Sequence, residues 1–455
     1  MKHRRRRITI LMSLLALGAS AGGLTVMPAA GQAPVLEPPL ATSPNVHLLA
    51  HVPGTAAGMN FKGHYAYVSG WGGITVLDIA KADAPRVAGV LPLPHFENED
   101  VDLCGNTLLV VNDREARDLG SLMYVISIAN PTTPVVSAIL PLGATAAPGR
   151  GSGHIANFVK SDCSQAWVDG GDHVEVVDLS NPSAPRSLGK FESAASLSDA
   201  FKVSHDTELD STGTAWSVGG GGAAGYRLTA DPLAPQLLAT TGTAGRNPSP
   251  YNDFILHNSQ RRGNTLLVTE EDYIDTDEVP PGGCRGQGKF ETWDVSGMST
   301  GGITPQGTWE TELNGMFTGG AVDSKAPVTV NCSSHWFDAR KGIAAVGWYE
   351  QGVRFLDYRT PTAITQVGYY IPANGSTWAA YWSPTDPKGE IVYTADAYRG
   401  IDVLRIDRGG TTGKKVKAPV PAKWFGSPTA DSPSFKPHPE YGFMCPILKP
   451  DVDTP

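Results

Sequence analysis

The segment VVDLSNPSAPRSLG at residues 176–189 decides the fold, because similar segments recur along the chain. TVLDIAKADAPRVAGVLPLP occupies residues 75–94, and VISIANPTTPVVSAILPLG occupies residues 125–143. Each copy contains a short run of β-branched residues, a turn that contains proline and a second apolar run. Proline pre-sets φ and has no backbone N–H to donate, so this turn marks the boundary between two strands.

Seven copies of this element occur along the chain. They are centred on Asp78, Ser127, Asp178, Leu228, Asp294, Asp357 and Arg405. A spacing of roughly 50 residues is typical of a propeller blade. Each copy follows a polar segment and an alternating strand, so one repeat holds four short antiparallel strands and no amphipathic helix. The sequence therefore predicts an all-β, seven-bladed β-propeller of four-stranded antiparallel blades.

The last repeat is incomplete, because the apolar pattern stops at Asp407 before an outer strand is finished. The segment Asn45–Ala50 has the composition of the missing strand, so we expect an N-terminal strand to close the ring. A solenoid is the structural alternative, although it normally keeps its repeats more regular and adds polar caps. The propeller then spans residues 45–408, between an extended arm at 34–44 and a Pro-rich tail at 409–455.

Residues 1–33 have the pattern of a signal peptide. A basic head precedes a short apolar run at residues 8–17, and Gly31-Gln-Ala33 is a small-x-small cleavage site. The run is too short for a good spanning helix, and no second long apolar stretch follows. We therefore expect a secreted, extracellular protein without a transmembrane segment in its mature form. General secretion and twin-arginine export both stay open.

The charge balance of the mature chain argues against two classes of partner, nucleic acids and anionic membrane surfaces. Removing the head leaves a net charge of about −14, because all its charged residues are basic. Nucleic-acid binding requires Lys and Arg patches, and anionic membrane surfaces attract the same residues. Neither partner is expected.

Three segments resemble the LVIVD repeats of secreted bacterial β-propeller proteins. They are GITVLDIAKADAPRVAG at 73–89, VEVVDLSNPSAPRSLG at 174–189 and GVRFLDYRTPTAITQVG at 352–368. The resemblance implies a propeller fold and an extracellular location. It implies no particular activity.

Four histidines occupy matching positions, where the innermost strands of four consecutive repeats begin. They are His154, His205, His257 and His335, and Glu99 takes the same place in the second repeat. Tyr381 or Trp382 comes nearest in the seventh repeat. Because these positions open on one mouth of the central channel, we expect the side chains to converge. Loops on that face add carboxylates, which are those of Asp113, Asp172, Glu270, Glu271, Asp272, Glu350 and Asp396.

The ring has two interpretations. In the first, the five matching residues hold a divalent or copper ion, which would serve a hydrolase of a small ester or lactone, or an oxidoreductase. Selenium-binding-type and lactonase-type propellers resemble this arrangement in outline, without a matching motif. In the second, each histidine hydrogen-bonds a loop aspartate and only fastens its blade. The aspartates placed for that role are Asp172, Asp206, Asp272 and Asp396.

The sequence favours a binding or scaffold protein that recognises a ligand, glycan or protein at the channel mouth, and the metal-dependent enzyme is the alternative. Candidate ligand-binding residues at the mouth are Asp172, Asp272, Trp348, Tyr349, Glu350, Tyr381, Asp396 and Arg399. The insertion at residues 272–288 overhangs the mouth, either as a lid or as a plain surface loop.

Five cysteines remain after cleavage, and an exported chain permits disulfides. Cys104 and Cys163 occupy matching first turns of adjacent repeats and are expected to pair. Cys284 and Cys332 are a second expected pair, on the mouth side. Cys445 is then left over.

Overall fold

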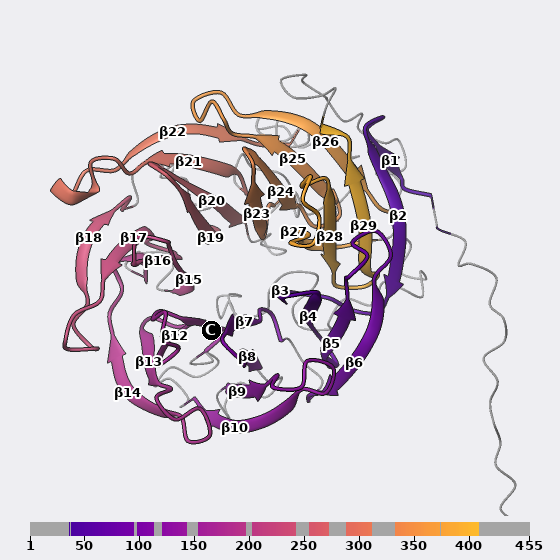
Figure 1. Ribbon diagram of the computed structural model, residues 1–455. Coiled ribbons are helices and arrows are strands. Elements are labelled where there is room, and N and C mark those ends of the chain that lie inside the picture. Colours follow the sequence, from indigo (N-terminus) through magenta and orange to yellow (C-terminus); the bar gives the residue numbers. More distant parts are fainter. Residues whose placement is uncertain are drawn as a thin grey trace, which may run out of the picture. The chain divides into compact units, whose positions relative to one another are not determined.

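The computed structural model describes residues 36, 38–94, 98–112, 121–142, 153–196, 203–242, 254–272, 288–311, 333–373 and 375–408. Within these ranges the chain forms seven antiparallel sheets, arranged as a wheel around a central axis (Figure 1). The described helical turns are two short 3₁₀ turns, and no described helix is long and apolar enough to cross a membrane. The prediction of a seven-bladed propeller is confirmed.

Blades one to four follow chain order. Blade one holds β3 (Met59–Lys62), β4 (Tyr65–Gly70), β5 (Gly73–Asp78) and β6 (Arg86–Pro92). Blade two holds β7 (Asp102–Cys104), β8 (Thr107–Asn112), β9 (Leu122–Ser127) and β10 (Val135–Pro141). Blade three holds β11 (Ile155–Phe158), β12 (Gln165–Asp169), β13 (Val174–Asp178) and β14 (Arg186–Phe191). Blade four holds β15 (Ser204–Leu209), β16 (Thr214–Gly219), β17 (Gly222–Arg227) and β18 (Gln236–Thr240).

Blades five to seven continue the pattern. Blade five holds β19 (Phe254–Arg262), β20 (Thr265–Asp272), β21 (Phe290–Asp294) and β22 (Thr304–Trp309). Blade six holds β23 (Phe337–Arg340), β24 (Ile343–Gly347), β25 (Val353–Asp357) and β26 (Thr365–Ile371). Blade seven holds β27 (Thr377–Trp382), β28 (Ile391–Asp396) and β29 (Gly400–Ile406), with its fourth strand supplied by the N-terminal region.

That fourth strand is β2 (Val46–Pro53), which closes the ring as expected. It pairs antiparallel with β29, so that Val46 lies opposite Ile406 and Pro53 opposite Gly400. A further short strand, β1 (Ala41–Thr42), pairs with β26 and makes blade six five-stranded. The sequence predicted only an extended arm there, because two residues are too few to show a strand period.

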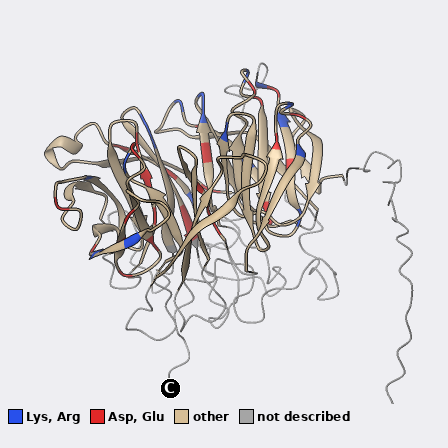
Figure 2. Cartoon of the chain, turned by 60° about the horizontal axis from the view of Figure 1, so that its bottom comes forward, with Lys and Arg blue, Asp and Glu red and all other residues tan. Residues whose placement is uncertain are grey.

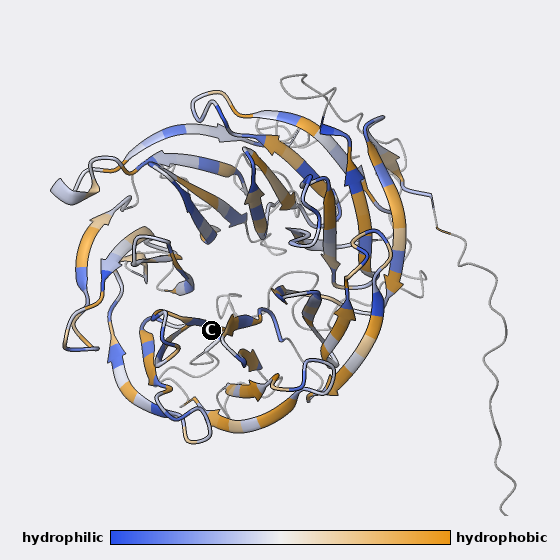
Figure 3. Cartoon of the chain, viewed as in Figure 1, coloured by the Kyte–Doolittle hydropathy of each residue, from blue (hydrophilic) through white to orange (hydrophobic). Residues whose placement is uncertain are grey.

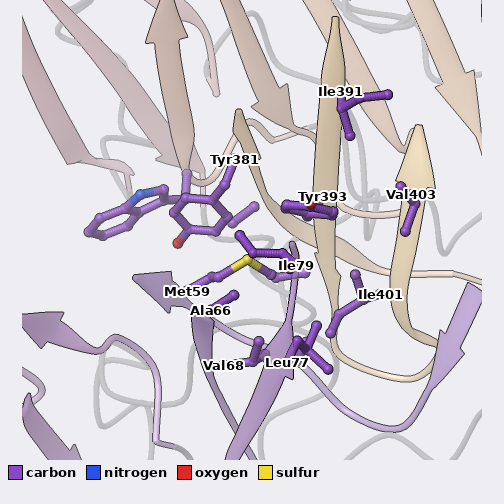
Figure 4. Packing of buried hydrophobic residues seen from close by; sticks show 14 of the residues in the cluster. Met59, Ala66, Val68, Leu77, Ile79, Tyr381, Ile391, Tyr393, Ile401 and Val403 are labelled. Atoms are coloured by element: carbon purple, nitrogen blue, oxygen red, sulfur yellow. The ribbon is translucent and has the colours of Figure 1, made fainter. Parts of the chain in front are cut away.

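The core lies between neighbouring blades. Figure 4 shows Met59, Leu77 and Ile79 of the blade-one region packed against Tyr393 and Ile401 of blade seven, all in one buried cluster. The outer strand β10 is largely apolar (Figure 3), and its residues alternate between exposed and half-buried. The second strands of the blades, such as β8, are therefore almost wholly buried, whereas the outer strands keep one side exposed.

The recurring proline turn packs against the outer strand of the preceding blade. A Cβ built on Gly89 of β6 would lie 2.0 Å from the carbonyl oxygen of Thr132, in the turn of blade two. A Cβ on Gly307 of β22 would lie 2.3 Å from the carbonyl oxygen of Pro361, in the turn of blade six. A glycine in the outer strand therefore admits the backbone of the next turn.

One disulfide joins two adjacent blades. Cys104 ends β7 and Cys163 lies in the turn after β11, with Cα atoms 5.6 Å apart. The expected pairing of these two cysteines is confirmed. Cys284, Cys332 and Cys445 lie outside the described residues, as do residues 1–33 and 409–455.

Candidate functional site

Four buried imidazoles form a continuous row at one end of the channel. His154, His205, His257 and His335 are each at most 1 % exposed. Their ring centroids are 4.8 Å apart for the first pair, 3.9 Å for the second and 3.8 Å for the third. The histidines lie in or just before β11, β15, β19 and β23, the inner strands of four consecutive blades, so their matching places in the repeat result in direct side-chain contact.

Glu99 joins both ends of the row. Its Oε2 atom is paired with Nε2 of His154. Its Oε1 atom lies 3.4 Å from Nε2 of His257 and 3.4 Å from Nε2 of His335. The carboxylate, which is 2 % exposed, thus contacts histidines of three different blades.

Backbone carbonyls fix the tautomers of two histidines. Nδ1 of His205 lies 3.0 Å from the carbonyl oxygen of His257, and Nδ1 of His335 lies 3.0 Å from that of Trp378. A carbonyl oxygen only accepts, so each Nδ1 carries the proton and each Nε2 presents a lone pair. Neither Nε2 has a hydrogen-bond partner among the described residues, and neither ring nitrogen of His257 has one.

Electrostatics favour the neutral form of His205 and His335 and the charged form of Glu99. Burial, followed by repulsion from His257, holds the pKa of His205 and that of His335 well below the ordinary histidine value. Burial would raise the pKa of Glu99, but attraction to His154 and a hydrogen bond from His154 outweigh it. The pKa of Glu99 is therefore held well below its ordinary value. Neutral imidazoles beside an ionised carboxylate are the form in which these groups bind metals.

A second carboxylate, Glu271 of β20, lies at the same centre. Its Oε2 atom is 3.6 Å from Nε2 of His257, and its Oε1 atom accepts a hydrogen bond from the hydroxyl of Tyr349. Tyr349 is fully buried, and its ring lies 5.1 Å from that of His335. Its backbone has a positive φ of 45°, and it forms an isolated bridge to Thr377 of blade seven. Blades five, six and seven therefore hold Glu271 in place together.

The blade-seven neighbour of the row is Trp378, not Tyr381 or Trp382. Its ring centroid is 5.0 Å from that of His335. A bulge between Thr377 and Ala379 shifts the register at this point, which sequence spacing could not reveal. A count that starts from the Gly-Ser-Thr-Trp segment at the start of β27 would have identified Trp378 from the sequence.

The candidate ligand-binding residues separate into several groups. Tyr349 lies at the centre, whereas Trp348 is fully buried and packs edge-on against Trp309. Asp396 accepts hydrogen bonds from the backbone N–H groups of Tyr398 and Arg399, and Arg399 donates to the carbonyl of Ala373. Asp396 and Arg399 therefore stabilise the turn between β28 and β29.

The remaining candidates lie away from the histidines or are only partly described. Asp172 is exposed and hydrogen-bonded to His173. Tyr381 lines a separate cavity, and Glu350 is half-buried in the β24–β25 loop. The side chain of Asp272, together with Asp113 and residues 273–287 of the insertion, lies outside the described residues.

The aspartates expected to fasten the histidines have other partners. Asp206 accepts a hydrogen bond from Asn157 at 2.8 Å, and Asp396 accepts one from Thr377 at 3.2 Å. Besides the hydrogen bonds from His205 and His335 to carbonyls of the next blade, a second set of contacts joins blades three residues further along the inner strands. There Asp102 accepts the backbone N–H of Phe158 at 2.7 Å, and Asp338 accepts that of Trp382 at 3.0 Å. The histidines therefore contact backbone carbonyls of the next blade, and not the aspartates expected to fasten them.

A cavity of about 360 Å³ adjoins that second layer. Carboxyl groups, amides and aromatic rings line it, including Asp100, Glu208, Asn157 and Tyr381. Burial raises the pKa of Asp100 to about 7 and that of Glu208 to about 8. Figure 2 shows that acidic residues recur on several of the sheets, so this layer is one part of a widely acidic protein.

The comparisons with known proteins agree with the fold. The LVIVD repeat model matches residues 53–88 and 168–192. The chain carries LVIVD repeats. The first match covers most of blade one, including its proline turn, and the second covers β13 and β14 of blade three. They confirm the resemblance inferred for the segments at 73–89 and 174–189. No functionally curated protein matches the LVIVD-repeat chain in sequence.

Solved β-propellers share the architecture. The Cps50 (Swd1) β-propeller domain of Myceliophteria thermophila is 11% identical, over 80% of this chain and 100% of that one, with a TM-score of 0.51. The WD40 β-propeller domain of Doa1 is 8% identical, over 80% and 99% of the two chains, with a TM-score of 0.49. At such identities the likeness concerns the fold alone.

Proposed function

We propose that this LVIVD-repeat propeller binds a divalent transition-metal ion at the channel mouth, through Oε1 of Glu99 and Nε2 of His257 and His335. The observation that carries the proposal is the pair of 3.4 Å separations between Glu99 Oε1 and the two imidazole nitrogens. Tetrahedral ligands at bonds of about 2.0–2.1 Å stand roughly 3.3 Å apart. Both separations from Glu99 Oε1 therefore match those of metal ligands, and ligand atoms of the three residues all lie within 4.8 Å of one another.

The chemistry of the donors supports the same conclusion. Imidazole nitrogen with one or two carboxylates suits zinc, copper, iron or nickel better than calcium or magnesium. Burying lone pairs such as Nε2 of His335 without a partner costs free energy, about 1–3 kcal/mol for each group. An ion would satisfy several of them at once, and Glu271 and Tyr349 would orient the site from outside the three ligands.

A metal held by three protein atoms leaves a coordination position for water or substrate. Such an ion supplies either Lewis-acid chemistry for hydrolysis or redox chemistry, which are the two activities the sequence suggested. The chain's own contribution is a water-poor pocket, neutral imidazoles and a carboxylate held by His154. On this proposal the protein is a metal-dependent propeller, and ligand recognition takes place at the same mouth.

We propose further that the mature protein works outside the cytoplasm. The observations that support export are the basic and apolar segment at residues 1–33 and the disulfide between Cys104 and Cys163, which persists in oxidising compartments.

Metal analysis of the purified mature protein tests the proposal. After gel filtration in metal-free buffer, we expect at least one zinc, copper, iron or nickel ion per chain by mass spectrometry. His257→Ala and His335→Ala should each lose it, because each removes a ligand, whereas the matched exposed variant His64→Ala should retain it. A chain that elutes without metal, and binds none when zinc or copper is added back, would refute the proposal.

A further inference from the structure

A second set of buried ligands lies beside the first. Besides the group of Glu99, His257 and His335, the ligand atoms of Glu99, His154 and His205 lie within 4.8 Å of one another. The two groups share Glu99 and no histidine. We infer that the centre holds two divalent ions, bridged by the Glu99 carboxylate; this inference rests on the metal site proposed above.

The two carboxylate oxygens of Glu99 lie beside different histidines. Oε2 is paired with Nε2 of His154, and Oε1 lies 3.4 Å from Nε2 of both His257 and His335. A carboxylate whose oxygens address different imidazoles is placed to bridge two ions, one on each oxygen.

His205 provides the independent reason to add a second ion. It is fully buried, its Nδ1 is held by the carbonyl of His257, and its Nε2 has no hydrogen-bond partner among the described residues. Its ring lies against that of His154 with centroids 4.8 Å apart. The first ion, bound by Glu99 Oε1, His257 and His335, would not be coordinated by Nε2 of His205. A second ion on the Oε2 side of Glu99 would be coordinated by this nitrogen and by His154.

Copper titration of the metal-stripped full-length protein tests this inference. Equilibrium dialysis against Cu²⁺ should give two bound ions per chain. The integrated electron paramagnetic resonance signal should fall short of two spins, because neighbouring ions couple. His154→Ala and His205→Ala should each bind one ion and show an uncoupled spectrum. His173→Ala, which removes an exposed histidine, should still bind two coupled ions.

The outcomes separate the two proposals. Saturation of the wild type at one ion, with a full uncoupled signal, would overturn the second site and leave the first standing. The second site would also be overturned if both His154→Ala and His205→Ala still bound two ions, or if His173→Ala no longer did. Either result would indicate binding at the surface. If no ion binds, both proposals fall.

Discussion

Glu99 is the residue on which the proposed centre depends, because its two oxygens contact histidines of three other blades. The sequence placed Glu99, His154, His205, His257 and His335 at matching positions, and position within a repeat was enough to predict their convergence. Their orientation was not predictable, since it depends on hydrogen bonds such as that from Nδ1 of His335 to the carbonyl of Trp378. Tyr349 and Glu271 were recognised only as mouth residues, because their contact crosses blades.

Glu208 should make the stability of the protein depend on pH. Burial, and then repulsion from Asp102 and Asp100, raise the pKa of this carboxyl to about 8, from roughly 4.3 in the unfolded chain. The folded state therefore holds the proton more tightly. The stabilisation is fully present below pH ~4.3 and is lost as pH rises through about 8.

We therefore predict that the free energy of unfolding falls less for Glu208→Gln than for the wild type as the pH rises from 5 to 9, because glutamine carries no proton to release. Urea unfolding at several pH values measures the difference. The exposed variant Glu192→Gln should follow the wild type. A Glu208→Gln protein with the wild-type pH dependence would show that this carboxyl is not protonated in the folded state.

At the scale of the elements, the proline turn and the outer-strand glycine form the repeated contact between blades. The sequence predicted the turn from Pro spacing, and the matches to LVIVD repeats fall on it. It did not predict the partner of the turn, because Gly89 and Thr132 belong to different repeats and no local pattern links them. The same limit applies to β1, whose pairing with β26 joins residues more than 300 positions apart in the chain.

Gly89→Ala should destabilise the protein by about 1–3 kcal/mol, as overpacking of a close contact usually does. The added Cβ would lie 2.0 Å from the carbonyl oxygen of Thr132, so β6 or the turn must move. Gly72→Ala is the matched control, since its Cβ would meet nothing within 4 Å. Chemical denaturation gives both values, and equal midpoints for the two variants would disprove the proposed role of the contact.

For the whole molecule, closure of the ring brings side chains from distant parts of the sequence to one axis. The repeat count and the incomplete seventh unit were sufficient to predict closure by an N-terminal strand, because an open sheet edge is unfavourable. The register of β2 on β29, with Val46 opposite Ile406, was not predictable, since both strands are similarly apolar.

Removing residues 38–53 should abolish cooperative folding, because β29 then lies at an open edge and the cluster around Val46 loses part of its lining. Circular dichroism should show a broad thermal transition at lower temperature than that of the full chain. A synthetic peptide of residues 45–53 added in trans should sharpen the transition, and a scrambled peptide should not. Unchanged cooperative melting of the shortened chain would contradict closure by β2.

Anomalous diffraction from crystals soaked in zinc tests the metal centre most directly. We predict a peak at the zinc edge about 2 Å from Glu99 Oε1, His257 Nε2 and His335 Nε2. Peaks confined to exposed histidines such as His64 or His173, with none among the four buried imidazoles, would contradict it.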